Sequence, residues 1–141
     1  MNFRQLTQQD IDWMRENTGD KAFWKSLPER VDYDYCLEHC GDVLCAGGVR
    51  LMNETTAVGW IDISPKGHEH IVLCYRTISE WMIQLCQSIG IIRLEAYVRE
   101  GFGAGVRTVE HLGFSFERKV PRYFGNTDAM LFVRFFEQES K

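Results

Sequence analysis

Thiol and imidazole side chains are the first residues in this sequence whose chemistry and spacing could form a site. Five cysteines lie at positions 36, 40, 45, 74 and 86. A zinc ion held by Cys36, His39, Cys40 and Cys45 is one interpretation, because zinc prefers thiolate and imidazole ligands. The sequence, however, has no Cys-x-x-Cys pair, and these residues fall on two expected strands. The odd number of cysteines instead indicates reduced thiols that pack as small apolar side chains.

Composition predicts one globular domain over residues 1–141. The chain is 45% hydrophobic and 26% charged with a net charge of −4, so it can bury a core and is not of the disordered class. It has no run of five basic residues, which argues against nucleic acid as a partner. It also has no apolar run of membrane-spanning length and no signal-peptide core. We therefore expect a cytoplasmic domain that does not enter a membrane.

The first half of the chain predicts mostly strands. Period-two alternation and turn residues place strands at 2–6, 33–38, 43–51 and 56–63. Thr7 is expected to cap a helix that contains Ile11 and Met14, and Asp20 to open a second helix that ends at Pro28. Gly47 and Gly48 lie inside the third strand, where glycines often mark a bulge.

The second half alternates helices and strands. Apolar residues at three- and four-residue steps predict a long helix over 70–89, which Gly90 ends. Further strands are expected at 92–99, 114–118 and 128–136, with a connection at Pro121–Thr127. Val106, Val109 and Leu112 lie on one face of a short helix before Gly113. Because a helix separates the strands at 56–63 and 92–99, these two strands should be parallel.

One stretch of this second half resembles a known family. Arg93-Leu94-Glu95-Ala96-Tyr97-Val98, followed by Arg107, Glu110 and Leu112-Gly113-Phe114, resembles the second half of the GNAT N-acetyltransferase fold. The resemblance implies an α/β (α+β) fold: a mixed, mostly antiparallel sheet of six to seven strands flanked by about four helices. The alternative is an unrelated amphipathic helix between two strands.

The resemblance also implies a substrate and a place for it. GNAT proteins transfer acetyl from acetyl-CoA to a primary amine of a protein or small molecule, without a covalent intermediate. Here the backbone at Ile61 and Ile63 would hold the pantetheine arm, and Lys66, Gly67 and His68 would receive the pyrophosphate. Gly103 and Gly105 would allow close approach of the cofactor. Trp13, Phe23 and Trp24 would line the acceptor side or belong to the core.

Candidates for proton transfer follow from the same resemblance. Asp62 ends the fourth strand, where the family often places a carboxylate that acts through water. His68 and His70 are alternative bases, because imidazole titrates near neutral pH. Tyr97 and Tyr123 are the candidate acids. A plain core or surface role is the alternative for each of them.

A second interpretation is a GNAT-like protein that binds without catalysing. The loop at 64–70 has Gly67 as its only glycine, and Glu69 would repel a pyrophosphate. Phe102 stands where many family members have Asn, and Val109 where many have Tyr. The chain is also similar to GNAT-like proteins of short-tailed bacteriophages, including a virion component, through Ala46-Gly47-Gly48 and Trp60. Its partner would then be a host protein, its location the host cytoplasm or the virion, and a homodimer is conceivable in either interpretation.

Overall fold

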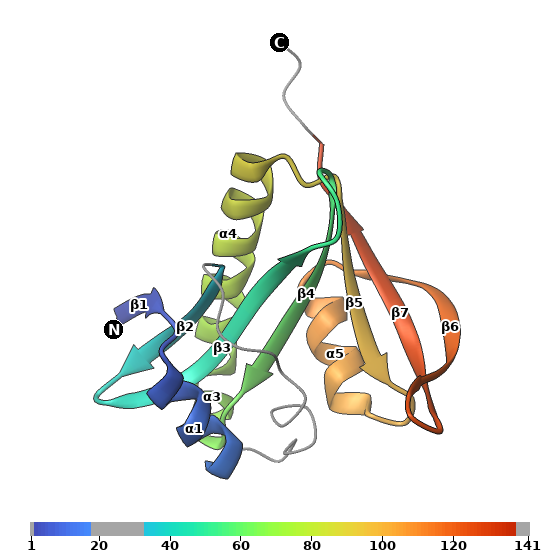
Figure 1. Cartoon of the computed structure of the whole chain (residues 1–141). Coiled ribbons are helices and arrows are strands. Elements are labelled where there is room, and N and C mark those ends of the chain that lie inside the picture. The colour runs from blue at the N-terminus through green and yellow to red at the C-terminus, as the bar shows by residue number, and fades with distance from the viewer. Residues whose placement is uncertain (1, 18–32, 138–141) are drawn as a thin grey trace. The chain divides into compact units, whose positions relative to one another are not determined.

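A computed structural model describes residues 2–17 and 33–137 of the chain (Figure 1). They form a mixed sheet of seven strands in the order β1-β2-β3-β4-β5-β7-β6, together with four described helices. The elements are β1 (Asn2–Gln5), α1 (Gln8–Asn17), β2 (Asp34–His39), β3 (Asp42–Leu51), β4 (Thr56–Ile63), α3 (Pro65–His68), α4 (Ile71–Ile89), β5 (Arg93–Arg99), α5 (Gly103–His111), β6 (Ser115–Phe124) and β7 (Thr127–Phe135). β4 and β5 are parallel, as predicted, whereas β1–β2, β2–β3, β5–β7 and β6–β7 are antiparallel. The predicted sheet is therefore confirmed.

The described residues group into two compact units. Among the described residues, the first contains 2–17, 33–49 and Ile61–Thr77, and the second contains Arg50–Trp60 and 78–137. The single domain inferred from composition stays a prediction. The helix expected from Asp20 to Pro28, with Phe23 and Trp24, lies outside the described residues.

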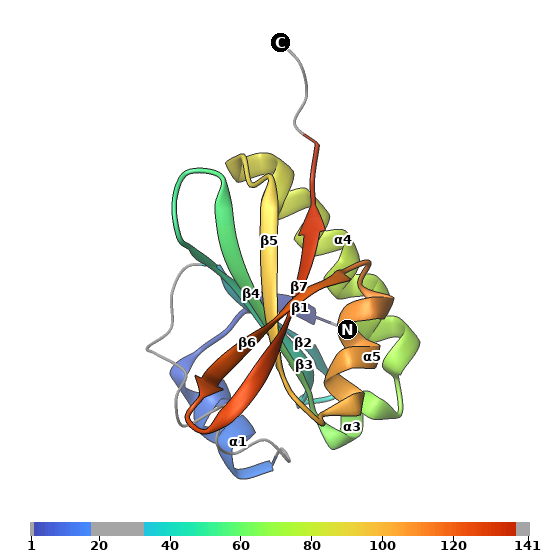
Figure 2. The same cartoon turned by 90° about the vertical axis from the view of Figure 1, so that its right-hand side faces the viewer.

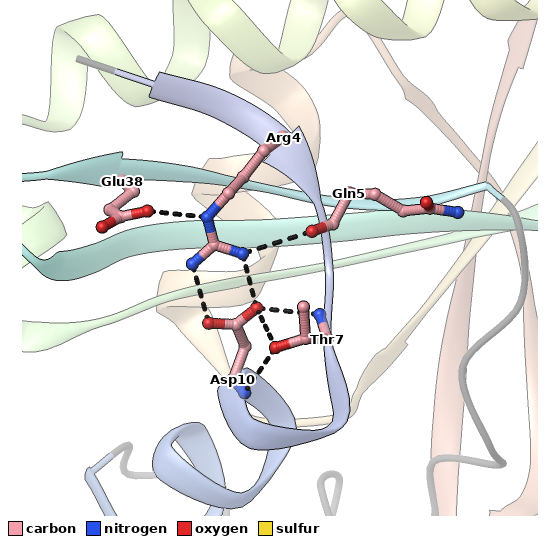
Figure 3. Close-up of polar contacts among 5 residues, drawn as sticks. All are labelled: Arg4, Gln5, Thr7, Asp10 and Glu38. Atoms are coloured by element: carbon pink, nitrogen blue, oxygen red, sulfur yellow. Dashed lines mark hydrogen bonds and ion pairs between the residues drawn. The ribbon is translucent and has the colours of Figure 1, made fainter.

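A polar cluster joins β1, α1 and β2 in the first unit (Figure 3). The Arg4 guanidinium donates to both carboxylate oxygens of Asp10, at 2.7 and 2.9 Å, and to Glu38 at 2.6 Å. The Thr7 amide donates to Asp10, and the Asp10 amide donates back to the Thr7 hydroxyl. These reciprocal bonds form a capping box, so Thr7 starts α1 as predicted. We refer to Arg4, Thr7, Asp10 and Glu38 as the N-terminal clamp.

The hairpin between β2 and β3 contains a bulge that was expected elsewhere. Its tight turn is made by Cys40 and Gly41, with φ of 53° and 83°. Leu37 pairs with Cys45 and Glu38 pairs with Val43, which leaves Leu44 without a partner in the ladder. The bulge is thus at Leu44, and the prediction from Gly47 and Gly48 is wrong, since both glycines pair in register with β2. A bulge turns the backbone groups of the extra residue out of the ladder.

Helix α4 has the predicted apolar face. Its fully buried residues recur every four positions: Cys74, Ile78, Met82 and Cys86. The helix begins at Ile71, one residue after the predicted start. At its end, Gly90 has a φ of 83°, and the Ile91 amide donates to the Cys86 carbonyl at 2.8 Å. This is a Schellman stop, which satisfies a carbonyl that the helix itself leaves open.

Helix α5 and the start of β6 form a corner in the second unit. Val109, Leu112 and Phe114 are buried. Gly113 has a φ of 88°, and the Phe114 amide donates to the Val109 carbonyl at 3.0 Å. The Arg134 guanidinium on β7 donates to the Leu112 carbonyl at 2.6 Å. The expected stop at Gly113 is therefore confirmed, with Arg134 as a second cap.

Strand β6 is longer than its sequence suggests. The residues expected to form a connection, Pro121–Phe124, continue the strand instead, and the turn to β7 lies at Gly125. The register shifts between Val120 and Phe124, and Arg122 has a φ of 54°. β6 is the last strand of the sheet order, and an edge strand can carry a proline at such an irregularity.

Candidate active site

The parallel pair β4–β5 has a short register. Thr56, Ala57 and Val58 pair with Arg93, Leu94 and Glu95. The register ends at Val58 and Glu95, although β4 continues to Ile63 and β5 to Arg99. Backbone groups after this point are not used by that ladder. Glu95 is therefore the last residue of β5 that pairs with β4.

One face of β5 carries three polar residues, Arg93, Glu95 and Tyr97. A Cβ placed on Gly105 of α5 would lie 3.0 Å from Val98, so Val98 faces α5, which lies beside β5 (Figure 2). Because side chains alternate along a strand, Arg93, Glu95 and Tyr97 project from the opposite face.

The Glu95 carboxylate is held from two sides. Glu95 is only 8% exposed. Oε2 accepts from Arg93 Nε at 2.8 Å, and Oε1 accepts from the Tyr97 hydroxyl at 2.9 Å. Arg93 in turn donates two bonds of 2.8 Å to Glu117 of β6. A buried carboxylate needs such partners, because burial otherwise opposes its charge.

Tyr97 is fixed by a second aromatic ring. The rings of Tyr97 and Tyr123 stack with centroids 4.1 Å apart and planes 4° from parallel. Burial raises the pKa of Tyr97 to about 12, and the hydrogen bond to Glu95 adds to this effect. Burial also raises the pKa of Tyr123, with a contribution from the Glu95 charge. Both hydroxyls therefore stay protonated at neutral pH.

The connection between β4 and α4 in the first unit is anchored on the Leu44 bulge. The Ser64 amide donates to the Leu44 carbonyl at 3.0 Å, and the Ser64 hydroxyl donates to the Val43 carbonyl at 2.6 Å. The Gly67 amide donates to Ser64 Oγ at 3.1 Å, so Ser64 caps α3. We refer to residues 64–70 as the β4–α4 connection.

Backbone amides of the β4–α4 connection are largely engaged within the first unit. Donors besides Ser64 and Gly67 are His68 to the Ser64 carbonyl, Glu69 to Lys66 and His70 to Gly67, at 2.9–3.2 Å. A Cβ on Gly67 would overlap the Leu44 carbonyl oxygen. Contact with β3 thus requires a glycine here, independently of any ligand. A phosphate group at this connection would compete with bonds that already exist.

The charged candidates of the connection neutralise one another. Lys66 Nζ lies 3.3 Å from Glu69 Oε2, and both side chains are exposed. His68 is also exposed, whereas His70 is half-buried with its ring edge-on to His39, at 5.8 Å between centroids. Glu69 therefore reduces the positive charge that Lys66 offers to an anion.

The remaining candidates lie on β4 and α5. Ile61 and Asp62 are half-buried and Ile63 is buried. Gly103 starts α5, and Gly105 lies under the exposed Phe102 ring, which a Cβ would approach to 2.7 Å. Phe102 occupies the N-cap position but makes no side-chain capping bond.

The structure brings some candidates together within each unit. In the second unit Tyr97 and Tyr123 are in contact, and Gly103 and Gly105 share the first turn of α5. In the first unit Asp62, Ile61 and Ile63 share the end of β4, and Lys66, Gly67 and His68 share α3. Trp13 of α1 is half-buried.

Sequence reasoning overlooked Glu95 as a site residue. A signal was present, because Arg93, Glu95 and Tyr97 alternate with buried apolar residues on a central strand. The hydrogen bond between Tyr97 and Glu95 could not be read from that alternation. In the described ranges, no cluster of three or more His, Cys, Asp or Glu residues is placed to hold a metal ion. Nor does any described helix have the length and apolarity of a membrane span.

Comparison with solved structures identifies the architecture. The ribosomal-protein-S18-alanine N-acetyltransferase of Escherichia coli superposes with a TM-score of 0.73 at 18% identity, covering 99% of this chain and 96% of that one. The chain has a GNAT-like fold. A putative acetyltransferase from Salmonella typhimurium with its cofactor acetyl-CoA gives 0.72 at 16% identity, over 100% and 96% of the two chains.

A third structure extends this similarity to another named activity. A spermidine N-acetyltransferase chimera from Vibrio cholerae and a human enzyme gives a TM-score of 0.72 at 13% identity, over 96% of both chains. No family model and no curated protein sequence matches this chain. At these identities the similarity establishes the fold alone.

Proposed function

We propose that this chain is an acetyl-CoA-dependent N-acetyltransferase that acts on a primary amine of a protein or small molecule. The observation that carries the proposal is the parallel β4–β5 pair whose register stops at Val58 and Glu95, within a GNAT-like fold. The β4 backbone beyond Val58 lies outside that register and is proposed to hold an extended pantetheine arm, which resembles a strand in its hydrogen-bonding needs. Ile61 and Ile63 are the β4 residues assigned to it.

The other roles are assigned to residues of each unit in turn. Asp62 is the proposed base, acting through water, with His68 and His70 as alternatives. Tyr97 and Tyr123 are the hydroxyls proposed as acids. Lys66, Gly67, His68, Gly103 and Gly105 are proposed to contact the cofactor.

Binding of acetyl-CoA is the first test. The melting temperature should rise with acetyl-CoA and not with ATP, and a ligand at 100 times its Kd stabilises by about 2.7 kcal/mol. Transfer is then followed by loss of thioester absorbance in the presence of spermidine or peptides with free amino groups. Asp62→Asn should lower turnover while acetyl-CoA affinity stays at the wild-type value. Equal turnover in both proteins from pH 6 to 9 would remove Asp62 from the mechanism.

A GNAT-like protein that acts by binding is the second candidate. The engaged amides of the β4–α4 connection favour it, because they leave fewer donors for a pyrophosphate. Such a protein could serve in a phage virion or modulate a host protein. Its expected result is a melting temperature that acetyl-CoA does not change.

A further inference from the structure

We propose that Tyr97 takes the proton of the attacking amine while it passes its own proton to Glu95, which is the positioning residue and final acceptor of this relay. The inference rests on the proposed acetyl transfer. It gives Tyr97 the role of proton acceptor during the attack, in place of the acid expected from sequence, and it assigns a function to Glu95. Asp62 keeps the earlier step, in which the substrate ammonium loses its first proton to become the attacking amine.

The direction of the relay follows from the existing hydrogen bond. The Tyr97 hydroxyl already donates its proton to Glu95 Oε1, at 2.9 Å. Its oxygen keeps lone pairs that can accept from an amine N–H. The ring cannot swing away easily, because it is stacked on Tyr123 at 4.1 Å.

Glu95 is fixed in the geometry that an acceptor needs. Arg93 holds its other oxygen at 2.8 Å, and Arg93 is itself held by two bonds to Glu117. The Arg93 guanidinium also lies 5.9 Å from the centre of the Phe135 ring. The charged and titratable groups around Glu95 are therefore Arg93 and Tyr97 of β5, and Glu117, Arg118 and Tyr123 of β6. The bonds from Arg93 and Tyr97 keep Glu95 Oε1 directed at the Tyr97 hydroxyl.

Tyr97 alone is poorly suited to either half of the exchange. With a pKa of about 12 it would give its proton to a thiolate only against the free-energy gradient, and a free tyrosinate would be equally costly to form. Passing the proton to Glu95 in the same step avoids the tyrosinate. The relay thus delivers the amine proton to a carboxylate through a tyrosine oxygen.

The step balances without another reactant. The amine nitrogen forms a bond to the acetyl carbonyl carbon, and its proton moves to the Tyr97 oxygen. The Tyr97 proton moves to Glu95 Oε1, which becomes a carboxylic acid. The C–S bond of the thioester breaks, and the thiolate leaves with the electron pair and takes a proton from solvent. Glu95 then returns its proton to solvent, which leaves an amide and free coenzyme A.

Three variants and a control separate the relay from a structural role. Glu95→Gln keeps the shape but cannot take a proton, Glu95→Asp keeps the carboxylate but not the reach, and Tyr97→Phe keeps the ring stack. Glu100→Gln is the matched control, because Glu100 is exposed and pairs with Lys119. Each protein is assayed for kcat with acetyl-CoA and spermidine or a peptide with free amino groups, and for acetyl-CoA affinity by calorimetry.

The relay predicts that Glu95→Asp is faster than Glu95→Gln. If Glu95 only filled space, Glu95→Gln would be the faster variant. Glu95→Gln and Tyr97→Phe should each lower kcat by roughly 100-fold, and the double variant should be no slower than the slower single variant. Glu95→Asp should keep more activity than Glu95→Gln. Acetyl-CoA affinity and the Glu100→Gln control should match wild type.

Three contrary outcomes would overturn the relay, and the last of them would also overturn the proposed acetyl transfer. If Glu95→Gln is at least as active as Glu95→Asp, Glu95 is only a shape-filling residue and the relay is wrong, while acetyl transfer stands. If a folded Tyr97→Phe variant turns over like wild type, the relay fails even where the Glu95 variants do not fold. A wild type that neither binds acetyl-CoA nor acetylates these amines overturns the proposed function and the relay with it.

Discussion

Gly67 shows at the scale of one residue how a glycine can be required without a ligand. Its Cα sits against the Leu44 carbonyl oxygen, and its amide is bonded to Ser64. The glycine that the family resemblance assigns to cofactor approach is thus also the contact between the β4–α4 connection and β3. Stability and cofactor binding can be separated experimentally at this position.

Replacing Gly67 by Ala should destabilise the protein by about 3 kcal/mol or more. The added methyl group would force the connection away from β3, and overpacking against backbone is relieved only by backbone shifts. Gly103→Ala is the control, since a Cβ there meets only the flexible end of Arg107 at 3.4 Å. Chemical denaturation measures the stability of both variants. A Gly67→Ala midpoint equal to that of Gly103→Ala would contradict the close approach of Gly67 to the Leu44 carbonyl oxygen.

The Lys66–Glu69 pair permits a test of the connection as an anion site. Glu69→Gln should tighten acetyl-CoA binding by roughly 0.3–1 kcal/mol, because it removes a negative charge and frees Lys66. Lys66→Gln should weaken binding, and both effects should shrink in high salt. Calorimetric titration at two salt concentrations measures them. If neither variant alters affinity, the phosphates do not bind at this connection.

At the scale of elements, the N-terminal clamp connects β1, α1 and β2 through charged groups with little exposure. Burial by itself would raise the pKa of Asp10, but hydrogen bonds from Arg4 and Thr7 outweigh it, and the net pKa is lowered. A carboxylate with a lowered pKa stabilises the folded state at any pH above its ordinary value. That contribution is lost as the pH falls through the lowered folded pKa.

Asp10→Asn should therefore cost about 1–3 kcal/mol at neutral pH, the range for hydrogen bonds to charged groups. The difference from wild type should begin to narrow as the pH falls below about 4, where the carboxylate of the unfolded chain takes up its proton, and should be lost below the lowered pKa of the folded protein. Asp12→Asn on the same helix is the control, because the Asp12 side chain is 62% exposed. Urea midpoints across this pH range give the measurement. A difference that stays constant down to low pH would show that the Asp10 charge is not involved.

The corner between α5 and β6 is the second element that makes a stability prediction. Leu112→Ala and Phe114→Ala should each cost about 2–5 kcal/mol, since the two residues are 3% and 6% exposed. Phe116→Ala, on the exposed side of β6, should cost less than about 1 kcal/mol. Equal urea midpoints for all three variants would show that the corner is not part of the core.

At the scale of the whole molecule, the reactivity of the cysteines tests whether the interiors of both units are closed to solvent. Cys36, Cys45, Cys74 and Cys86 are buried and Cys40 is exposed at the β2–β3 turn. Burial raises the pKa of Cys36 to about 12 and that of Cys86 to about 11. Thiolate is the reactive form, so the raised pKa protects Cys36 and Cys86 in addition to burial, and burial alone shields Cys45 and Cys74 from a reagent.

A thiol reagent should consequently label one cysteine quickly in the native protein and all five after denaturation. Cys40→Ser should abolish the fast phase without changing the melting temperature, because Cys40 is exposed. The kinetics of absorbance change with an aromatic disulfide reagent measure both phases. More than one fast thiol in native protein would contradict the burial pattern.

The sequence by itself determined the order and type of most described elements. Period-two and helical periodicities, Gly90, Gly113 and Thr7 are local signals, and local hydrogen bonds realise them. The crossover through α4 also required parallel strands, which the structure contains. Only the tertiary structure decided the Leu44 bulge, the extension of β6 through Pro121 and the bond between Tyr97 and Glu95. Each depends on which strand lies opposite or how far a side chain reaches, and neither quantity is encoded in the spacing of residues along one segment.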